Sequence, residues 1–344
     1  SISFLLLVFQ QSIAAFSFYL INCNDSIEPL AQQYFYIRIW SAPACLCQYV
    51  ILGWFLGRQN TTSPLLIVVT TNACNICLDL LFVVHYGMNT EGVALASVLA
   101  EYIGLIFGVL LVIRNIPVSS LSLSWPHLLQ ADKIKAMLLI NGHLFVRTLC
   151  LIFTFSFFTV QGAKFGSAIL AANAILMNFQ TFMAYALDGF AHAAEALIGR
   201  ALGAKNKILF QQSIKTTALW SLLVALLFTL TFNFAGQDII NSLTHLTEVR
   251  EPAYEYLPWL IALPLISFSS FLLDGVFIGA TLSRQMRDCI LLSLFLVFLP
   301  SWYYTQDLTN HGLWLALSLF MLMRTLIMLG YYLYYQRSIM QSLA

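Results

Sequence analysis

Ten long runs of apolar residues limit what this sequence can fold into. They lie near residues 1–21, 30–56, 64–86, 92–114, 137–160, 167–199, 216–236, 256–281, 288–304 and 311–335. A helix of about 20 mostly apolar residues spans the hydrocarbon core of a bilayer, whereas membrane β-barrel strands are shorter and alternate in polarity. Only 9 % of the residues are charged, against about 25 % in soluble proteins. The sequence therefore predicts an all-α polytopic membrane protein.

The second half of the sequence repeats the order of landmarks found in the first half. A Glu-Pro pair, a mid-segment proline and two glycines recur about 220 residues further along the chain. The pairs are Glu28-Pro29 with Glu251-Pro252, Pro43 with Pro264, Gly57 with Gly279, and Gly92 with Gly312. Residues 136–214 have no counterpart in the first copy. From the duplication we therefore expect a longer protein, with roughly 80 to 110 further residues that form two helices before this chain.

Several classes of function find no support in the sequence. The Cys45/Cys47 and Cys74/Cys77 pairs lie in apolar helices without a second pair of ligands, which favours packing over metal binding. The sequence contains no phosphate-binding loop, nucleophile elbow or zinc-protease motif. The formal net charge of +1 does not indicate nucleic-acid binding. We therefore expect neither an enzyme nor a resident cofactor or metal centre.

Polar side chains at membrane depth are the candidate functional residues, because they are costly in hydrocarbon and face a cavity or a partner. Asn72, Asn75 and Asp79 are spaced three, then four residues apart on one predicted helix, which places them on one face. Ser97 and Glu101 carry a hydroxyl and a second carboxylate on the next helix. The alternative is a polar seam that only holds helices together.

The second half of the chain adds further polar residues at membrane depth. Asn173, Gln180 and Asp188 lie within one arc of the helix predicted at 167–199, and Asp274 stands where the first copy has Gly53. Arg147 and Arg324 are also deep in their segments. These two arginines can either extend to the interface or pair with an intramembrane acid. We regard Asn72, Glu101, Asn173, Gln180, Asp188 and Asp274 as candidate cavity or substrate residues.

At these positions the sequence resembles a known family of transporters. The segments that carry the resemblance are Ile37 to Ala44, Gly53 to Gln59, Asn72 to Asp79, Gly92 to Tyr102, Tyr185 to Ala191 and Leu273 to Ala280. Together they are similar to the multidrug and toxic compound extrusion (MATE) family, and more narrowly to its DNA-damage-inducible F (DinF) branch of Gram-negative bacteria. The resemblance covers essentially the whole chain. It implies two six-helix lobes around a cavity that opens alternately to each side of the inner membrane, with the ten segments as helices 3 to 12.

The resemblance also implies a division of the chain and a cation-coupling site. The expected parts are residues 1–115 as an incomplete N-lobe, 116–135 as a cytoplasmic linker, 136–336 as the C-lobe and 337–344 as a cytoplasmic tail. Asn75, Asp79 and Ser97 match three positions of the family's cation site, with Ser97 where relatives often have Thr. A fourth position, an Asp on helix 1, lies outside this chain. The implied coupling ion is a proton or Na⁺.

The expected function is efflux of cationic or amphipathic drugs or toxic metabolites in exchange for that ion, by a protein that works as a monomer. A cavity lined by aromatic and methionine side chains, with an acid that attracts cations, would suit such substrates. The alternative is a flippase for a lipid-linked precursor. A flippase that handles diphosphate head groups should present several arginines in its cavity, whereas the deep arginines of this sequence are Arg38, Arg147 and Arg324.

The distribution of cations predicts the topology. Eleven Lys and Arg residues lie in the connections after the second, fourth, sixth and eighth segments and in the tail, and only Lys164 and Arg250 lie on the opposite side. Cytoplasmic loops carry an excess of such residues. We therefore predict that alkaline phosphatase, which is active only in the periplasm, is silent when fused after Tyr335 and active when fused after Gly166. Activity after Tyr335 would contradict the topology.

Overall fold

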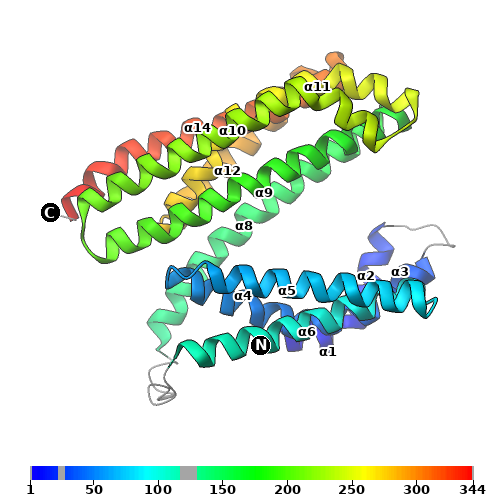
Figure 1. Cartoon of the computed structure of the whole chain (residues 1–344). Coiled ribbons are helices and arrows are strands. Elements are labelled where there is room, and N and C mark those ends of the chain that lie inside the picture. The colour runs from blue at the N-terminus through cyan, green and yellow to red at the C-terminus, as the bar shows by residue number, and fades with distance from the viewer. Residues whose placement is uncertain (1, 22–27, 117–129, 343–344) are drawn as a thin grey trace. The chain divides into compact units, whose positions relative to one another are not determined.

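The structure is a computed structural model, and it describes residues 2–21, 28–116 and 130–342. The chain divides into two compact units, residues 1–124 and 125–344, each with its own set of packed helices (Figure 1). The boundary between the units falls in the segment 116–135, of which residues 117–129 lie outside the described part. Every regular element in the described part is helical, which confirms the prediction of an all-α fold.

Unit 1 consists of helices joined by short connections. In order they are α1 (Ile2–Val8), α2 (Gln10–Ile21), α3 (Glu28–Arg38), the 3₁₀ turn η1 (Ile39–Ser41), α4 (Ala42–Gly57), α5 (Thr62–Asp79), the π-helical segment η2 (Leu80–His85) and α6 (Thr90–Asn115). Helix α6 packs against α3, α4 and α5. Its small residues Ala94, Ala100, Gly104 and Gly108 are buried in these contacts, because small side chains let membrane helices approach closely.

The helix over residues 28–57 is interrupted next to Pro43. A proline has no backbone N–H and disfavours helical geometry in the residue before it, so it is best accommodated in the first turn of a helix. Accordingly α3 ends at Arg38, η1 tightens the chain over Ile39–Ser41, and Pro43 stands in the first turn of α4. The interruption does not end the membrane span, which extends from Glu28 to Gly57.

Unit 2 contains the longest helices. They are α8 (Ala131–Ala163), α9 (Ser167–Gly203), α10 (Lys207–Leu243), α11 (Thr247–Gly279), α12 (Ser283–Leu292), the π-helical segment η4 (Ser293–Phe298), α13 (Leu299–Tyr304), the 3₁₀ turn η5 (Gln306–Leu308) and α14 (Thr309–Ser342). Helices α9, α10 and α11 run side by side in Figure 1 and pack against one another, and α11 also packs against α14. Unlike Pro43, Pro258 and Pro264 lie inside α11 without interrupting it.

Nine of the ten predicted membrane segments coincide with helices long and apolar enough to cross a bilayer within the described residues. The exception is 1–21, where the helix is divided into α1 and α2 at Phe9. Backbone hydrogen bonds from Phe9 N to Leu5 O and from Ile13 N to Phe9 O, both 2.9 Å, continue through the division. The prediction of helical membrane segments is thus confirmed, although the first segment is not a single regular helix.

Three helix ends in the two units use the same turn. Gln59, Lys205 and Thr281 each have a positive φ, two residues after the glycines that end α4, α9 and α11. In each turn the next N–H donates to the carbonyl five residues back, from Asn60 to Phe55, Asn206 to Ala201 and Leu282 to Phe277. This is the Schellman pattern, which satisfies the last carbonyl groups of a helix. The turn therefore ends each helix within a few residues and gives the carbonyls of Phe55, Ala201 and Phe277 a backbone donor.

A very close helix approach in unit 2 lies beside the candidate residue Asp274. A Cβ atom placed on Gly275 would lie 2.0 Å from the carbonyl oxygen of Ala191, and one on Gly279 would lie 2.5 Å from the carbonyl oxygen of Glu195. Both obstacles are backbone atoms of α9, which cannot turn aside as a side chain can. These two glycines therefore set the distance between α9 and α11.

We expect Gly275→Ala to destabilise the protein by about 1–3 kcal/mol, because the added methyl group must separate α9 from α11. The matched control is Gly189→Ala on α9, where a Cβ has no neighbour within 4 Å and alanine favours the helix. Thermal unfolding of the detergent-solubilised variants measures both effects. Equal unfolding temperatures for the two variants would show that the close contact between α9 and α11 does not exist.

Candidate functional site

The structure brings two of the three predicted cation-site residues into contact. Asn75 on α5 donates a hydrogen bond from Nδ2 to the Oγ of Ser97 on α6, with a length of 3.3 Å. Asp79 follows Asn75 by four residues and therefore lies one turn further along the same face of α5. Asn72, predicted as a cavity residue on that helix, is exposed in the described unit. Asn75, Asp79 and Ser97 thus lie along the boundary between α5 and α6.

Asp79 has a carboxylate oxygen that the protein leaves without a partner. Its Oδ1 is shielded from solvent and accepts no hydrogen bond within the described part of the chain. Asp79 is the last residue of α5, directly before the π-helical segment η2. Such segments are rare and occur frequently at functional sites. An oxygen in this position can accept a proton or a hard cation.

Glu101, a predicted cavity residue on α6, forms an ion pair with an arginine at the end of α3. Its Oε1 lies 3.6 Å from Nη2 of Arg38 at the end of α3, and Arg38 also donates to the hydroxyl of Ser41. The buried Gln48 side chain donates to the backbone carbonyl of Glu101 at 2.6 Å. The charge of Glu101 is therefore compensated, in contrast to that of Asp79.

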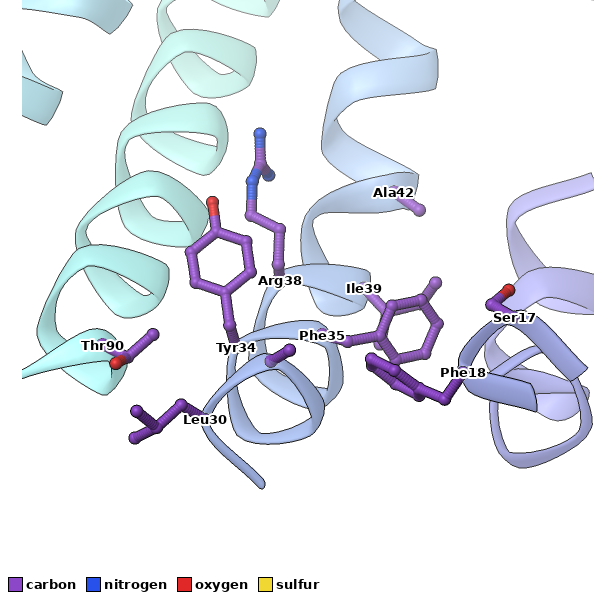
Figure 2. A pocket seen from close by; sticks show the side chains of 10 residues that line it. Ser17, Phe18, Leu30, Tyr34, Phe35, Arg38, Ile39, Ala42 and Thr90 are labelled. Carbon is purple, nitrogen blue, oxygen red and sulfur yellow. The ribbon is translucent and has the colours of Figure 1, made fainter. Parts of the chain in front are cut away.

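Arg38 also lines a cavity of about 670 Å³ in unit 1, shown in Figure 2. The Arg38 and Tyr34 side chains extend in the same direction, while the Phe35 and Phe18 rings pack edge to face, with their ring centroids 6.4 Å apart. Apart from Arg38, no charged side chain lines this cavity within the described residues. The cavity is therefore mainly apolar.

In unit 2, two arginines converge on Asp274. Nη2 of Arg324 on α14 lies 2.9 Å from Oδ2 of Asp274 on α11, and Nη2 of Arg147 on α8 contacts the same oxygen. Both Asp274 and Arg324 are buried. The sequence left open whether these arginines extend to the interface or pair with an acid, and the structure shows the pairing. We refer to Arg147, Arg324 and Asp274 as the triad.

The triad borders a cavity of about 480 Å³ within unit 2. The cavity is lined by one face of α8 and one face of α9, with one residue from α11 and two from α14. Its lining consists of Arg147, Leu151, Phe155, Met177, Gln180, Thr181, Ala184, Tyr185, Asp188, Phe271, Met321 and Arg324. Two predicted residues, Gln180 and Asp188, thus lie at this cavity. The Oε1 atom of Gln180 is buried and has no hydrogen-bond partner in the described chain.

Asn173, predicted as a cavity residue, lies in a separate polar network. It exchanges hydrogen bonds with Asn310, of 2.7 and 3.0 Å, and accepts one of 2.9 Å from the indole N–H of Trp314. All three residues are buried. This network links α9 to α14, which is the structural role that polar side chains often have between membrane helices. Asn173 also lines a cavity of only about 60 Å³.

Sequence reasoning identified the acids but not their partners. It did not associate Arg38 with Glu101, nor Asn310 and Trp314 with Asn173. The available signal was that a charge at membrane depth requires compensation. That signal does not say which of several distant cations supplies it. Among the described residues, no group of three or more His, Cys, Asp or Glu side chains could hold a metal ion.

Comparisons with known proteins agree with this architecture. The family model MatE matches residues 144–303. The DNA damage-inducible protein F of Escherichia coli is 38% identical over 332 residues, covering 94% of this chain and 70% of that protein. Protein DETOXIFICATION 42 of Arabidopsis thaliana is 25% identical, and the match covers 86% of this chain and 56% of the plant protein. A mutant of the Vibrio cholerae MATE transporter VcmN has the same fold, with a TM-score of 0.84 and 22% identity over 99% of this chain and 76% of that structure.

We expect Arg324→Leu to destabilise the protein by about 3–5 kcal/mol, because removal of one partner from a buried ion pair leaves an uncompensated charge. Arg284→Leu is the matched control, since the side chain of Arg284 is 74% exposed, and its effect should stay within about 0.5 kcal/mol. Denaturation of the purified variants distinguishes them. If Arg324→Leu unfolded at the same temperature as the control, the triad would not contribute to stability.

Proposed function

The chain belongs to the MATE family of membrane transporters, and on that premise we propose that it is a secondary active antiporter. It exports cationic or amphipathic compounds in exchange for protons or sodium ions. The identity to the Escherichia coli relative supports this assignment, as does the match to the family model. The proposed setting is the bacterial inner membrane, with the C-terminus in the cytoplasm.

The observation that carries the proposal is the unpartnered oxygen of Asp79. A carboxylate oxygen that is shielded from solvent without a partner is costly, and that cost falls when a proton or a cation binds. Asn75 and Ser97 provide an amide and a hydroxyl oxygen nearby, which are ligand types that suit a hard cation. We therefore assign Asn75, Asp79 and Ser97 to the coupling site.

Coupling requires that the ion change the relative stability of two conformations. A ligand shifts a conformational equilibrium only by the difference between its affinities for the two states. An ion on Asp79 neutralises the charge of a half-buried carboxylate where α5 changes from α-helical to π-helical geometry. We propose that this neutralisation favours one packing of α5 against α6 and so connects ion binding to alternating access.

The alternative function is a flippase for lipid-linked precursors. Two arginines do border the unit 2 cavity, as that alternative requires. However, both pair with Asp274, and Asp188 adds a further negative charge to the lining. The formal charges of these four groups sum to zero. A diphosphate head group would find no excess of positive charge, so the arrangement favours efflux of other compounds.

We expect Asp79→Asn to reduce ion-driven efflux at least tenfold, because the substitution keeps the size of the side chain but removes the charge that holds the ion. The measurement is efflux of a cationic dye from everted vesicles, with proton and sodium gradients imposed separately. Asp238→Asn changes an exposed carboxylate on α10 and should leave efflux unchanged. An unaltered efflux rate for Asp79→Asn under both gradients would contradict the coupling site and would leave the polar residues between α5 and α6 with only a structural role.

A further inference from the structure

The unit 2 cavity combines apolar walls with charged side chains of both signs. Its volume of about 480 Å³ lies within the range of small-molecule sites, roughly 300–1,000 Å³. Phe155, Met177 and Phe271 contribute apolar surface from three different helices. The charged side chains in its lining are Arg147, Arg324 and Asp188. Which of these side chains already have a partner within the protein determines which charged groups of a ligand the cavity can bind.

Arg324 is buried, and both of its terminal nitrogens point at groups of the protein. Its side chain is 3% exposed, with Nη2 bound to Asp274 and Nη1 directed at the sulfur of Met321, 3.4 Å away. Its guanidinium carbon lies 5.8 Å from the ring centroid of Phe320. These contacts hold the guanidinium of Arg324 against Asp274 at the edge of the cavity. Arg324 therefore has little capacity to bind a ligand directly.

Arg147 retains hydrogen-bonding capacity toward the cavity. Its side chain is 21% exposed, and Nη2 is bound to Asp274. A guanidinium has five N–H donors, and the other groups of Arg147 form no hydrogen bond within the described residues. Because Arg324 also holds Asp274, the acid stays compensated while Arg147 engages a further anionic group.

Asp188 is the opposite case, since it is a carboxylate without a partner. It lies in the cavity lining on α9, and within the described chain it forms neither a hydrogen bond nor an ion pair. The charged and titratable groups around it are Arg147, Arg324, Asp274 and His192, and His192 pairs instead with Glu195 at 3.5 Å. Among the charged groups of the lining, Asp188 is thus an acceptor without a partner and Arg147 is a partly free donor; the amide oxygen of Gln180 is a further, uncharged acceptor.

We propose that this cavity binds amphipathic zwitterions. Asp188 receives the ammonium group of the ligand, Arg147 receives its carboxylate, and Phe155, Met177 and Phe271 contact its apolar body. The inference deepens the proposed function and rests on it only for the statement that such ligands are transported. It assigns the recognition of charge to unit 2, separately from the coupling site at Asp79.

The net charge of the site favours a zwitterion over a singly charged ligand. The triad carries a formal charge of +1 and Asp188 carries −1, so the empty site is neutral. A ligand with both charges leaves the total at zero and gives each free group a partner. A lone cation or a lone anion instead leaves one unit of charge uncompensated in a region of low dielectric constant, which is unfavourable.

The test is a binding measurement with three probes that share a dansyl fluorophore and a five-carbon chain. Nε-dansyl-lysine carries an ammonium and a carboxylate, dansylcadaverine only an ammonium, and N-dansyl-6-aminohexanoate only a carboxylate. Fluorescence titration of the purified chain, corrected for protein-free micelles, gives a Kd for each. We expect the zwitterion to bind at least about tenfold more tightly than either singly charged probe. Equal affinities, or a preference for a singly charged probe, would overturn the proposal.

Two variants test which side chain binds which charged group of the ligand. Asp188→Asn should abolish the preference for the zwitterion over the anionic probe, and Arg147→Gln its preference over the cationic probe. Asp238→Asn and Arg284→Gln change exposed groups and should preserve both preferences. Asp188→Asn removes no contact within the described chain, so it tests the site without loss of packing. A retained preference in Asp188→Asn would overturn the assignment.

This binding experiment needs no ion gradient. If the zwitterion binds selectively but no efflux occurs under any gradient, the proposed transport function fails while the binding site remains. If efflux occurs but the probes bind without selectivity, the zwitterion site fails while the transport function remains.

Discussion

The cost of an uncompensated charge in hydrocarbon governs the polar interior of this protein. A chain with 9 % charged residues places few charges in its spans, and most described ones have a partner. Arg38 pairs with Glu101, and Arg147 and Arg324 pair with Asp274. Against this background the unpaired carboxylates are informative, because folding did not supply the groups that would stabilise them.

The two units differ in how they treat their acids, and the proposed function follows from that difference. In unit 1, Asp79 has a shielded oxygen without a partner, next to an amide and a hydroxyl. This arrangement suits a small ion. In unit 2, Asp274 on α11 pairs with two arginines. The carboxylate without a partner is that of Asp188, which lies at a cavity large enough for an organic molecule. We infer that ion coupling and ligand recognition lie in different units.

The sequence predicted local features well because they depend on residues close together in the chain. Apolar runs predicted nine of the spans, and helical spacing placed Asn75 and Asp79 on one face of α5. The family resemblance grouped Ser97 with them, and Ser97 is hydrogen-bonded to Asn75. Contacts between distant residues were not predictable in this way. Asp274 is 127 residues from Arg147 and 50 from Arg324, and only the packing of α8, α11 and α14 selects these arginines. Likewise the sequence grouped Asn173 with Gln180 and Asp188, but the structure pairs Asn173 with Asn310, and only the other two line the larger cavity.

Asp79 can bind an ion because one of its oxygens has no partner in the described chain, whereas Asp274 is paired with two arginines. Dicyclohexylcarbodiimide, an apolar reagent that modifies protonated carboxyl groups, tests this difference directly when peptide mass spectrometry locates the modified residue. We expect the reagent to modify Asp79, a reaction that a binding ion would suppress, and to leave Asp274 unmodified. Modification of Asp274 with Asp79 left unmodified would contradict this expectation.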